Sequence, residues 1–124
     1  MEKGKFAFED LEVWQKAVEF AEEVIDIAEQ TDTKRRHYRL IEQLESASTS
    51  VALNIAEGKG RYSKKEFIQF LYISRGSLYE TITLLIIFYK KTWISSEQLS
   101  VIKERGERIA KMLSSLINYI KKSI

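Results

Sequence analysis

Apolar residues recur at alternating spacings of three and four along most of the chain, as expected for the buried face of an α-helix. Within residues 10–29 this stripe consists of Leu11, Trp14, Val18, Ala21, Ile25 and Ala28. Within residues 36–57 it consists of Leu40, Leu44, Ala47, Val51 and Ile55. The pattern predicts two amphipathic helices in the first half of the chain.

The same spacing continues in the second half. Over residues 63–93 the stripe consists of Phe67, Leu71, Ser74, Leu78, Thr81, Leu85 and Phe88. Over residues 96–122, where Ser95 and Gln98 can form an N-terminal capping box, it consists of Leu99, Ile102, Gly106, Ile109, Leu113, Leu116 and Ile120. No segment has the pattern of a strand. We therefore predict a single all-α domain over residues 1–124, an antiparallel four-helix bundle of up-down-up-down course.

The segment 53–71 is predicted to end the second helix, turn the chain and begin the third. Gly58 and Gly60 favour positive backbone dihedrals that stop a helix. Ser63, with Glu66 three residues later, is a capping box that starts a new one. The turn also carries four cations, with no acid among them: Lys59, Arg61, Lys64 and Lys65.

Two features of the helices predict close contacts with neighbours. Residues 46–52 are small, which lets another helix approach, and Ser or Thr there can hydrogen-bond the preceding turn. Gly76, inside the third helix, predicts a close crossing that offsets its poor helix propensity. From Ile82 onward the third helix is apolar nearly all round, so part of it is predicted to form a subunit interface. That interface would comprise Ile82, Leu84, Ile86, Ile87 and Tyr89.

Composition narrows the class of protein. The chain has 124 residues, no proline and no cysteine, which excludes disulfides and cysteine-based metal sites. The longest apolar run, residues 84–89, is far shorter than the ~20 residues of a membrane span, and the first ten residues have no long apolar run. We expect a soluble cytoplasmic protein.

Charge is distributed unevenly along the chain. The formal net charge is only +2, yet residues 9–30 contain eight acids and one base, so the remainder carries the excess of positive charge. This asymmetry is typical of solvated helix faces. It also suits an acidic helix that docks on basic neighbours, or on a partner, and the sequence leaves both interpretations open.

Enzymatic chemistry finds no support in the residue pattern. A di-iron bundle needs inward carboxylates and Glu-x-x-His pairs, whereas the single histidine, His37, lies in a basic run and is interpreted as a surface residue. The serines of residues 46–50 have no base within helical reach. We predict a non-enzymatic protein without metal or cofactor.

Both ends of the predicted bundle are basic. At one end Lys34, Arg35, Arg36 and Arg39 of the first loop lie with Lys90 and Lys91. At the other, Lys59, Arg61, Lys64 and Lys65 lie with Lys3, Lys5, Lys121 and Lys122. Solvated loop cations are one interpretation, and contacts with RNA or DNA phosphates are the other. Tyr62 and Tyr72 could stack on bases or simply pack.

Four blocks of the sequence carry a family resemblance. They are Phe-Glu-Asp-Leu-Glu-Val-Trp-Gln-Lys-Ala at 8–17, Tyr-x-Leu-x-x-Gln at 38–43 leading to Ala47, Asn-Ile-Ala-Glu-Gly-x-Gly-Arg-x-Ser at 54–63, and Phe-x-x-Phe-Leu-x-Ile-x-Arg-Gly-Ser-x-x-Glu at 67–80. In this order they resemble the four-helix-bundle proteins encoded by intervening sequences in bacterial 23S rRNA genes. The signature residues are Asn54, Glu57, Gly58, Gly60, Arg61, Gly76 and Ser77.

The resemblance implies a bundle that assembles as a ring, a homopentamer, with no settled molecular activity. A more distant relative, the accessory variability protein of diversity-generating retroelements, is a basic pentameric bundle that binds nucleic acid and a reverse transcriptase. Glu45 and Ser46 depart from the basic residues common before Ala47 in the family, which argues against nucleic acid along the middle of the second helix. Structurally, Glu57 and Arg61 could pair and Asn54 could bond a neighbouring backbone.

Two function hypotheses follow. The first is a ring-forming bundle that binds RNA or DNA through its basic ends as a scaffold or accessory factor. The second is a protein–protein adaptor, with no nucleic-acid role, whose apolar and acidic faces carry the function.

Overall fold

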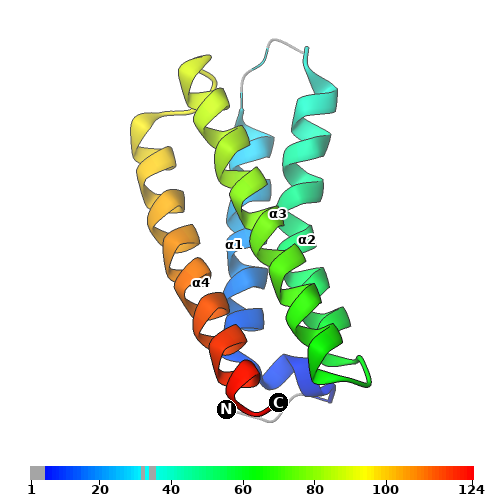
Figure 1. Ribbon diagram of the computed structural model, residues 1–124. Helices are drawn as coiled ribbons and strands as arrows, with labels where there is room; N and C mark the ends of the chain where they lie inside the picture. Colours follow the sequence, from blue (N-terminus) through cyan, green and yellow to red (C-terminus); the bar gives the residue numbers. More distant parts are fainter. Residues whose placement is uncertain (1–4, 32, 34–35) are drawn as a thin grey trace.

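The computed structural model describes residues 5–31, 33 and 36–124, and this part of the chain is entirely helical apart from its turns. It contains a short 3₁₀ helix, η1 (Ala7–Asp10), and the helices α1 (Glu12–Gln30), α2 (Tyr38–Lys59), α3 (Lys64–Lys90) and α4 (Ser96–Lys122). Figure 1 shows the four long helices side by side. The prediction of an all-α four-helix protein is confirmed, and each predicted helix end lies within three residues of the observed one.

The closest helix pair is α2 with α3, and small residues form the seam between them. The Ser50 and Ser77 hydroxyls lie 2.9 Å apart, and the buried Ser74 hydroxyl donates to the Val51 carbonyl at 2.7 Å. Within α2, Ser48 donates to the Glu45 carbonyl at 3.0 Å. The predicted role of the small residues in close packing is confirmed.

The core is apolar and draws on all four helices. Phe20 of α1, Leu44 of α2, Leu85 of α3 and Leu113 of α4 are each at most 1% exposed. The predicted stripes of α2, α3 and α4 all face this core, with Leu40, Phe67, Leu99 and Leu116 at its partly buried margin.

The predicted stripe of α1 was partly wrong. The helix buries Val13, Ala17, Phe20 and Val24 most deeply, whereas Trp14, Val18 and Ile25 are only half-buried. Because α1 packs against both α2 and α4, its apolar face is wide and accommodates two overlapping three-four series. Periodicity alone could not tell which series lies at the centre.

The close crossing predicted at Gly76 is absent, and Gly106 makes one instead. A Cβ added at Gly76 would meet nothing within 4 Å, whereas one at Gly106 would lie 3.0 Å from Cδ1 of Ile82. Gly106 is buried between α4 and α3, and Gly76 is exposed. Packing within a single chain therefore does not explain why residue 76 is glycine.

Helix α3 ends three residues before its predicted end, in a Schellman motif. Trp93 N–H donates to the Phe88 carbonyl at 2.9 Å, and Thr92 N–H donates to the Tyr89 carbonyl at 2.9 Å. Thr92 has φ of 66°, the left-handed conformation usually taken by glycine at this position. The rings of Trp93 and Phe88 pack edge to face, 5.1 Å apart.

Helix α3 meets the length and composition criteria of a membrane span, with a mean hydropathy of 1.2 over its most apolar 18 residues. This property was not predicted, because no uninterrupted apolar run of the sequence approaches the length of a membrane span. The mostly buried core helix of a water-soluble protein can meet the same criteria, and 33% of this window is buried here. Here Leu71, Leu78, Leu85 and Phe88 of α3 pack in the bundle core.

Candidate nucleic-acid interface

The turn between α2 and α3 is tight because two aromatic side chains lie against a glycine. A Cβ added at Gly58 would lie 2.6 Å from Cβ of Phe70 and 3.0 Å from Cδ1 of Phe67. Only a residue without a side chain fits there. Gly58 thus allows the start of α3 to fold back closely on the end of α2.

The positive dihedrals predicted for Gly58 and Gly60 do not occur. No described glycine has a positive φ, and Gly60 caps α2 at φ of −81° with its N–H donating to the Glu57 carbonyl at 3.2 Å. The capping box predicted at Ser63 is present only in part: the Ser63 hydroxyl accepts from Glu66 N–H at 3.1 Å, but the Glu66 carboxylate accepts from the Ser63 hydroxyl, at 3.2 Å, and not from the Ser63 backbone. Gly58 is therefore required for space and not for a left-handed backbone, whereas an added Cβ at Gly60 would make only an ordinary contact, 3.5 Å from the Glu57 carbonyl oxygen.

Arg61 is held against the turn by two partners. Its guanidinium lies 2.9 Å from Oε1 of Glu57, as predicted, and 4.6 Å from the ring centre of Phe70. The ammonium of Lys59 lies 5.8 Å from the ring centre of Phe67. Glu57 therefore offsets the positive charge of Arg61. The ammonium group of Lys59 instead lies over the aromatic ring of Phe67.

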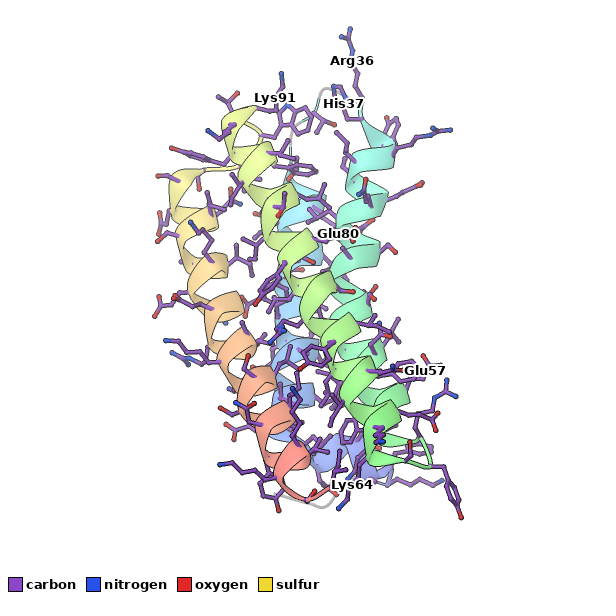
Figure 2. All side chains as sticks on the ribbon, in the orientation of Figure 1. Arg36, His37, Glu57, Lys64, Glu80 and Lys91 are labelled. Carbon is purple, nitrogen blue, oxygen red and sulfur yellow. The ribbon has the colours of Figure 1, made fainter. Side chains whose placement is uncertain are left out.

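The carboxyl end of α4 brings further cations to the same end of the bundle. The Lys64 ammonium donates to the Ser123 carbonyl at 3.2 Å, which joins the start of α3 to the end of α4. Figure 2 shows Lys64 at this end of the molecule. We call this surface the basic end, and it comprises Lys59, Arg61, Lys64, Lys65, Lys121 and Lys122.

The lysines of the basic end are not neutralised by carboxylates. In the described part of the chain the ion pairs join Lys16 to Glu19, Arg61 to Glu57 and Arg105 to Glu23. No carboxylate of a described residue lies within 4.0 Å of the ammonium of any of its five lysines, and all five are exposed. Of its nearby predicted members, Lys5 is exposed and Lys3 lies outside the described residues.

A tyrosine of α3 organises part of this end. The Lys121 ammonium donates to the Tyr72 hydroxyl at 2.7 Å and lies 5.4 Å from the ring centre. The guanidinium of Arg75 lies 4.9 Å from the same ring and donates to the Ser114 hydroxyl at 3.2 Å. This group could not be predicted from the sequence, because its members come from α3 and α4 and are up to 49 residues apart.

The opposite end of the bundle is basic as well. The His37 ring lies 4.7 Å from the Trp93 ring, which places the start of α2 beside the turn after α3. Figure 2 shows Arg36, His37 and Lys91 together at this end. The exposed cations here are Arg36, Arg39, Lys90 and Lys91, whereas Lys34 and Arg35 lie outside the described residues.

Two further signature residues, Asn54 and Ser77, contribute to the seam between α2 and α3. The Asn54 amide donates to both the carbonyl and the hydroxyl of Ser50, each at 2.8 Å, and Ser50 in turn contacts Ser77. The predicted bond from Asn54 to a neighbouring backbone is therefore present. These contacts give Asn54 and Ser77 a structural role.

The predicted subunit interface is corrected at one position. Leu84 is only 5% exposed and packs in the protomer core, so it is not available to a second copy. Ile87 and Tyr89 are 42% and 41% exposed, and Ile82 and Ile86 are half-buried. Helix α3 has more exposed apolar residues than predicted, since Ile73 and Tyr79 are also exposed.

A groove between α3 and α4 was not foreseen. It encloses about 610 Å³, with Leu78, Ile82, Gly106 and Ala110 among its apolar lining and Lys103 and Glu107 among its polar lining. No described residues form a group of three or more His, Cys, Asp or Glu side chains that could hold a metal ion. The groove therefore combines an apolar floor with two charged side chains of α4, Lys103 and Glu107.

The acidic helix α1 contacts α4 through a pair between Glu23 and Arg105. Burial of Glu23 raises the pKa of its carboxyl above the ordinary value of 4.5, and the nearby acids Glu19, Asp26 and Glu22 raise it further, while Arg105 lowers it. The raised pKa shows that Arg105 does not fully offset these effects.

Fold and surface together define an all-α bundle with cations at both ends, and comparison with known proteins identifies its family. Residues 9–115 match the sequence model of the 23S rRNA-intervening sequence protein family, so the chain belongs to that family. A crystal structure of a protein of unknown function from Bacteroides thetaiotaomicron, of the S23 ribosomal protein family, superposes with a TM-score of 0.79. The two sequences are 27% identical, and the match covers 85% of this chain and 97% of that one. No protein of curated function is similar enough to count as a relative.

Proposed function

We propose that this protein is a non-enzymatic subunit of a homo-oligomeric ring, a pentamer, that binds RNA or DNA phosphates through its basic ends. The observation that supports this most directly is the group of five exposed lysines at the basic end, none of which has a carboxylate within 4.0 Å in the part of the chain that the structure describes. Unpaired cations gathered on one surface attract a polyanion and exchange their counterions for its phosphates.

Assembly would strengthen this interaction. The helices are taken to follow an up-down-up-down course, which puts the turn after α2 and the end of α4 at one end of every subunit. A ring repeats that end around its axis, and several weak phosphate contacts on one rigid body act together. The exposed face of α3, with Ile73, Tyr79 and Ile87, supplies an apolar surface that a neighbouring copy could cover.

The binding proposal is tested by fluorescence anisotropy with a labelled structured RNA at low salt. The test variant combines Lys64→Glu, Lys65→Glu and Lys122→Glu, three exposed positions at the basic end. Arg61 is left intact because its bonds to Glu57 and Phe70 stabilise the turn. We expect the triple variant to lose binding at least tenfold.

The control makes the same change of charge at three exposed lysines or arginines outside this end: Lys103→Glu, Arg108→Glu and Lys111→Glu. This variant should lose less affinity than the basic-end variant. Equal losses would show that net charge alone governs binding, and failure of the wild type to bind at low salt would overturn the proposal.

A second candidate function is a protein–protein adaptor, with a partner such as a reverse transcriptase. It is favoured by the exposed face of α3, where Ile73 and Tyr79 are 52% and 55% exposed. An apolar face of this kind typically marks a contact with protein. If the assembled ring binds no nucleic acid and still leaves this face accessible, the adaptor function is the better explanation.

A further inference from the structure

Tyr62 projects from the basic end without packing against the protein. Its relative exposure is 105%, the highest among the large exposed hydrophobic residues of the described chain. It stands between Arg61 and Ser63 in the turn that joins α2 to α3. A wholly exposed aromatic ring contributes no burial to folding, so the fold does not explain why this position carries one.

Tyr72, at the same end of the bundle, differs from Tyr62 because its side chain makes contacts within the protein. Its ring lies under both Arg75 and Lys121, and its hydroxyl accepts a hydrogen bond from Lys121. These contacts occupy the surfaces that a nucleobase would need. Of the two tyrosines considered from the sequence, only Tyr62 has both ring faces free.

The cations near Tyr62 indicate which class of ligand would place an aromatic ring on it. Lys64 and Lys65 lie two and three residues after it in the sequence, and both are exposed and have no carboxylate of a described residue within 4.0 Å. An aromatic platform beside exposed cations is the arrangement that proteins use for single-stranded nucleic acid, in which bases stack and the backbone phosphates contact the positive charge. In a duplex, paired bases are stacked on one another and do not offer an open face to such a platform.

We propose that Tyr62 stacks on an unpaired base while Lys64 and Lys65 hold the adjoining phosphates, so that the ligand of the basic end is single-stranded or looped RNA or DNA. This inference rests on the proposed function and narrows it. Lysines alone would bind duplex and single strand alike through phosphate charge. Tyr62 adds affinity only where a base is free to stack.

The test compares three labelled probes of one sequence, a 12-nucleotide RNA strand, the DNA strand and the RNA duplex, by anisotropy at fixed low salt. Each is titrated with the full chain as wild type, Tyr62→Leu, Tyr62→Phe and the control Tyr119→Leu, which removes another exposed tyrosine from the last turns of α4. Thermal melting establishes that every variant folds, and none of these exposed side chains supports the core.

Tyr62→Leu should weaken single-strand binding about 5- to 150-fold, the range found when one base–aromatic stack is lost. Duplex affinity should stay unchanged, Tyr62→Phe should retain single-strand affinity, and Tyr119→Leu should resemble the wild type. A probe with 2-aminopurine should report quenching by stacking in the wild type and not in Tyr62→Leu. A preference shared by the RNA and DNA strands is expected, because stacking does not involve the 2′-hydroxyl.

Two failures can be told apart. In the first, the wild type binds the probes, and Tyr62→Leu either binds the single strands equally well or loses affinity for duplex and single strands in the same proportion. This result would overturn the stacking inference and leave the phosphate-binding function in place. If wild type binds none of the three probes at low salt, the proposed function itself is overturned, and the inference with it.

Discussion

Gly58 and Phe70 approach so closely that a Cβ at position 58 would lie 2.6 Å from Cβ of Phe70. Alanine normally favours a helix over glycine by about 1 kcal/mol. Here Gly58→Ala should instead destabilise the protein by about 1–3 kcal/mol, because the backbone of α2 or α3 must shift to admit the methyl group. Urea unfolding followed by circular dichroism measures the change.

Gly60→Ala is the matched control. Its φ of −81° is available to any residue, and an added Cβ would lie 3.5 Å from the Glu57 carbonyl, an ordinary contact. This variant should be neutral or slightly stabilising. A loss as large as that of Gly58→Ala would mean that the turn needs glycine for its backbone and not for space.

Thr92 occupies the left-handed position of the motif that ends α3, at φ of 66°. A residue with a Cβ pays about 1–2 kcal/mol for this conformation, and glycine does not. Thr92→Gly should therefore stabilise the protein by about 1 kcal/mol, and Thr92→Ala, which keeps the Cβ, should not. Equal stabilities of Thr92→Gly and Thr92→Ala in urea would contradict this explanation.

The raised pKa of Glu23 predicts a component of stability that depends on pH. Because the folded pKa lies above 4.5, the unfolded chain loses this proton first as the pH rises. The contribution of Glu23 to the free energy of unfolding therefore falls from about pH 4.5 upward until the folded carboxyl has also ionised. Glu23→Gln should remove this fall, with Glu29→Gln, on the exposed end of α1, as control.

Assembly through the face of α3 predicts sensitivity to charge there. Ile73→Lys combined with Ile87→Lys should dissociate the oligomer, because burying two unpaired ammonium groups is costly. Val101→Lys, at an exposed apolar residue of α4, should leave it assembled. Light scattering measures the mass, and a wild-type species of 14.5 kDa at micromolar concentration would contradict assembly.

Helix positions and most of the core could be predicted from the sequence because they depend on local periodicity. Leu44, Leu85 and Leu113 occupy the expected buried positions. For α1 the same reasoning chose Trp14 and Val18 over the more buried Ala17, since a wide apolar face contains more than one three-four series. Periodicity identifies a face but does not locate its centre.

Close contacts between helices could not be predicted, because they depend on which residues meet in space. Gly76 and Gly106 look alike in sequence, yet only Gly106 is crossed by another helix. Likewise Leu84 and Ile87 both lie in the apolar run of α3, and only the packing of α3 shows that Leu84 faces the core and Ile87 the outside.

The candidate site was partly predictable. The cations of residues 59–65 are adjacent in sequence, so their grouping needed no structure. The contacts of Tyr72 with Arg75 and Lys121 are tertiary and could not be predicted from the sequence. They are what distinguishes Tyr72 from Tyr62, which is fully exposed.

The most direct test of the central claim is the salt dependence of RNA binding, expressed as the slope of the logarithm of the binding constant against the logarithm of salt concentration. Each phosphate contact contributes about −0.7 to −0.9 to this slope. The wild type should show a steep negative slope, and reversing Lys64, Lys65 and Lys122 should flatten it by about 2 or more. A slope near zero in the wild type, or one that the triple variant leaves unchanged, would contradict phosphate binding by the basic end.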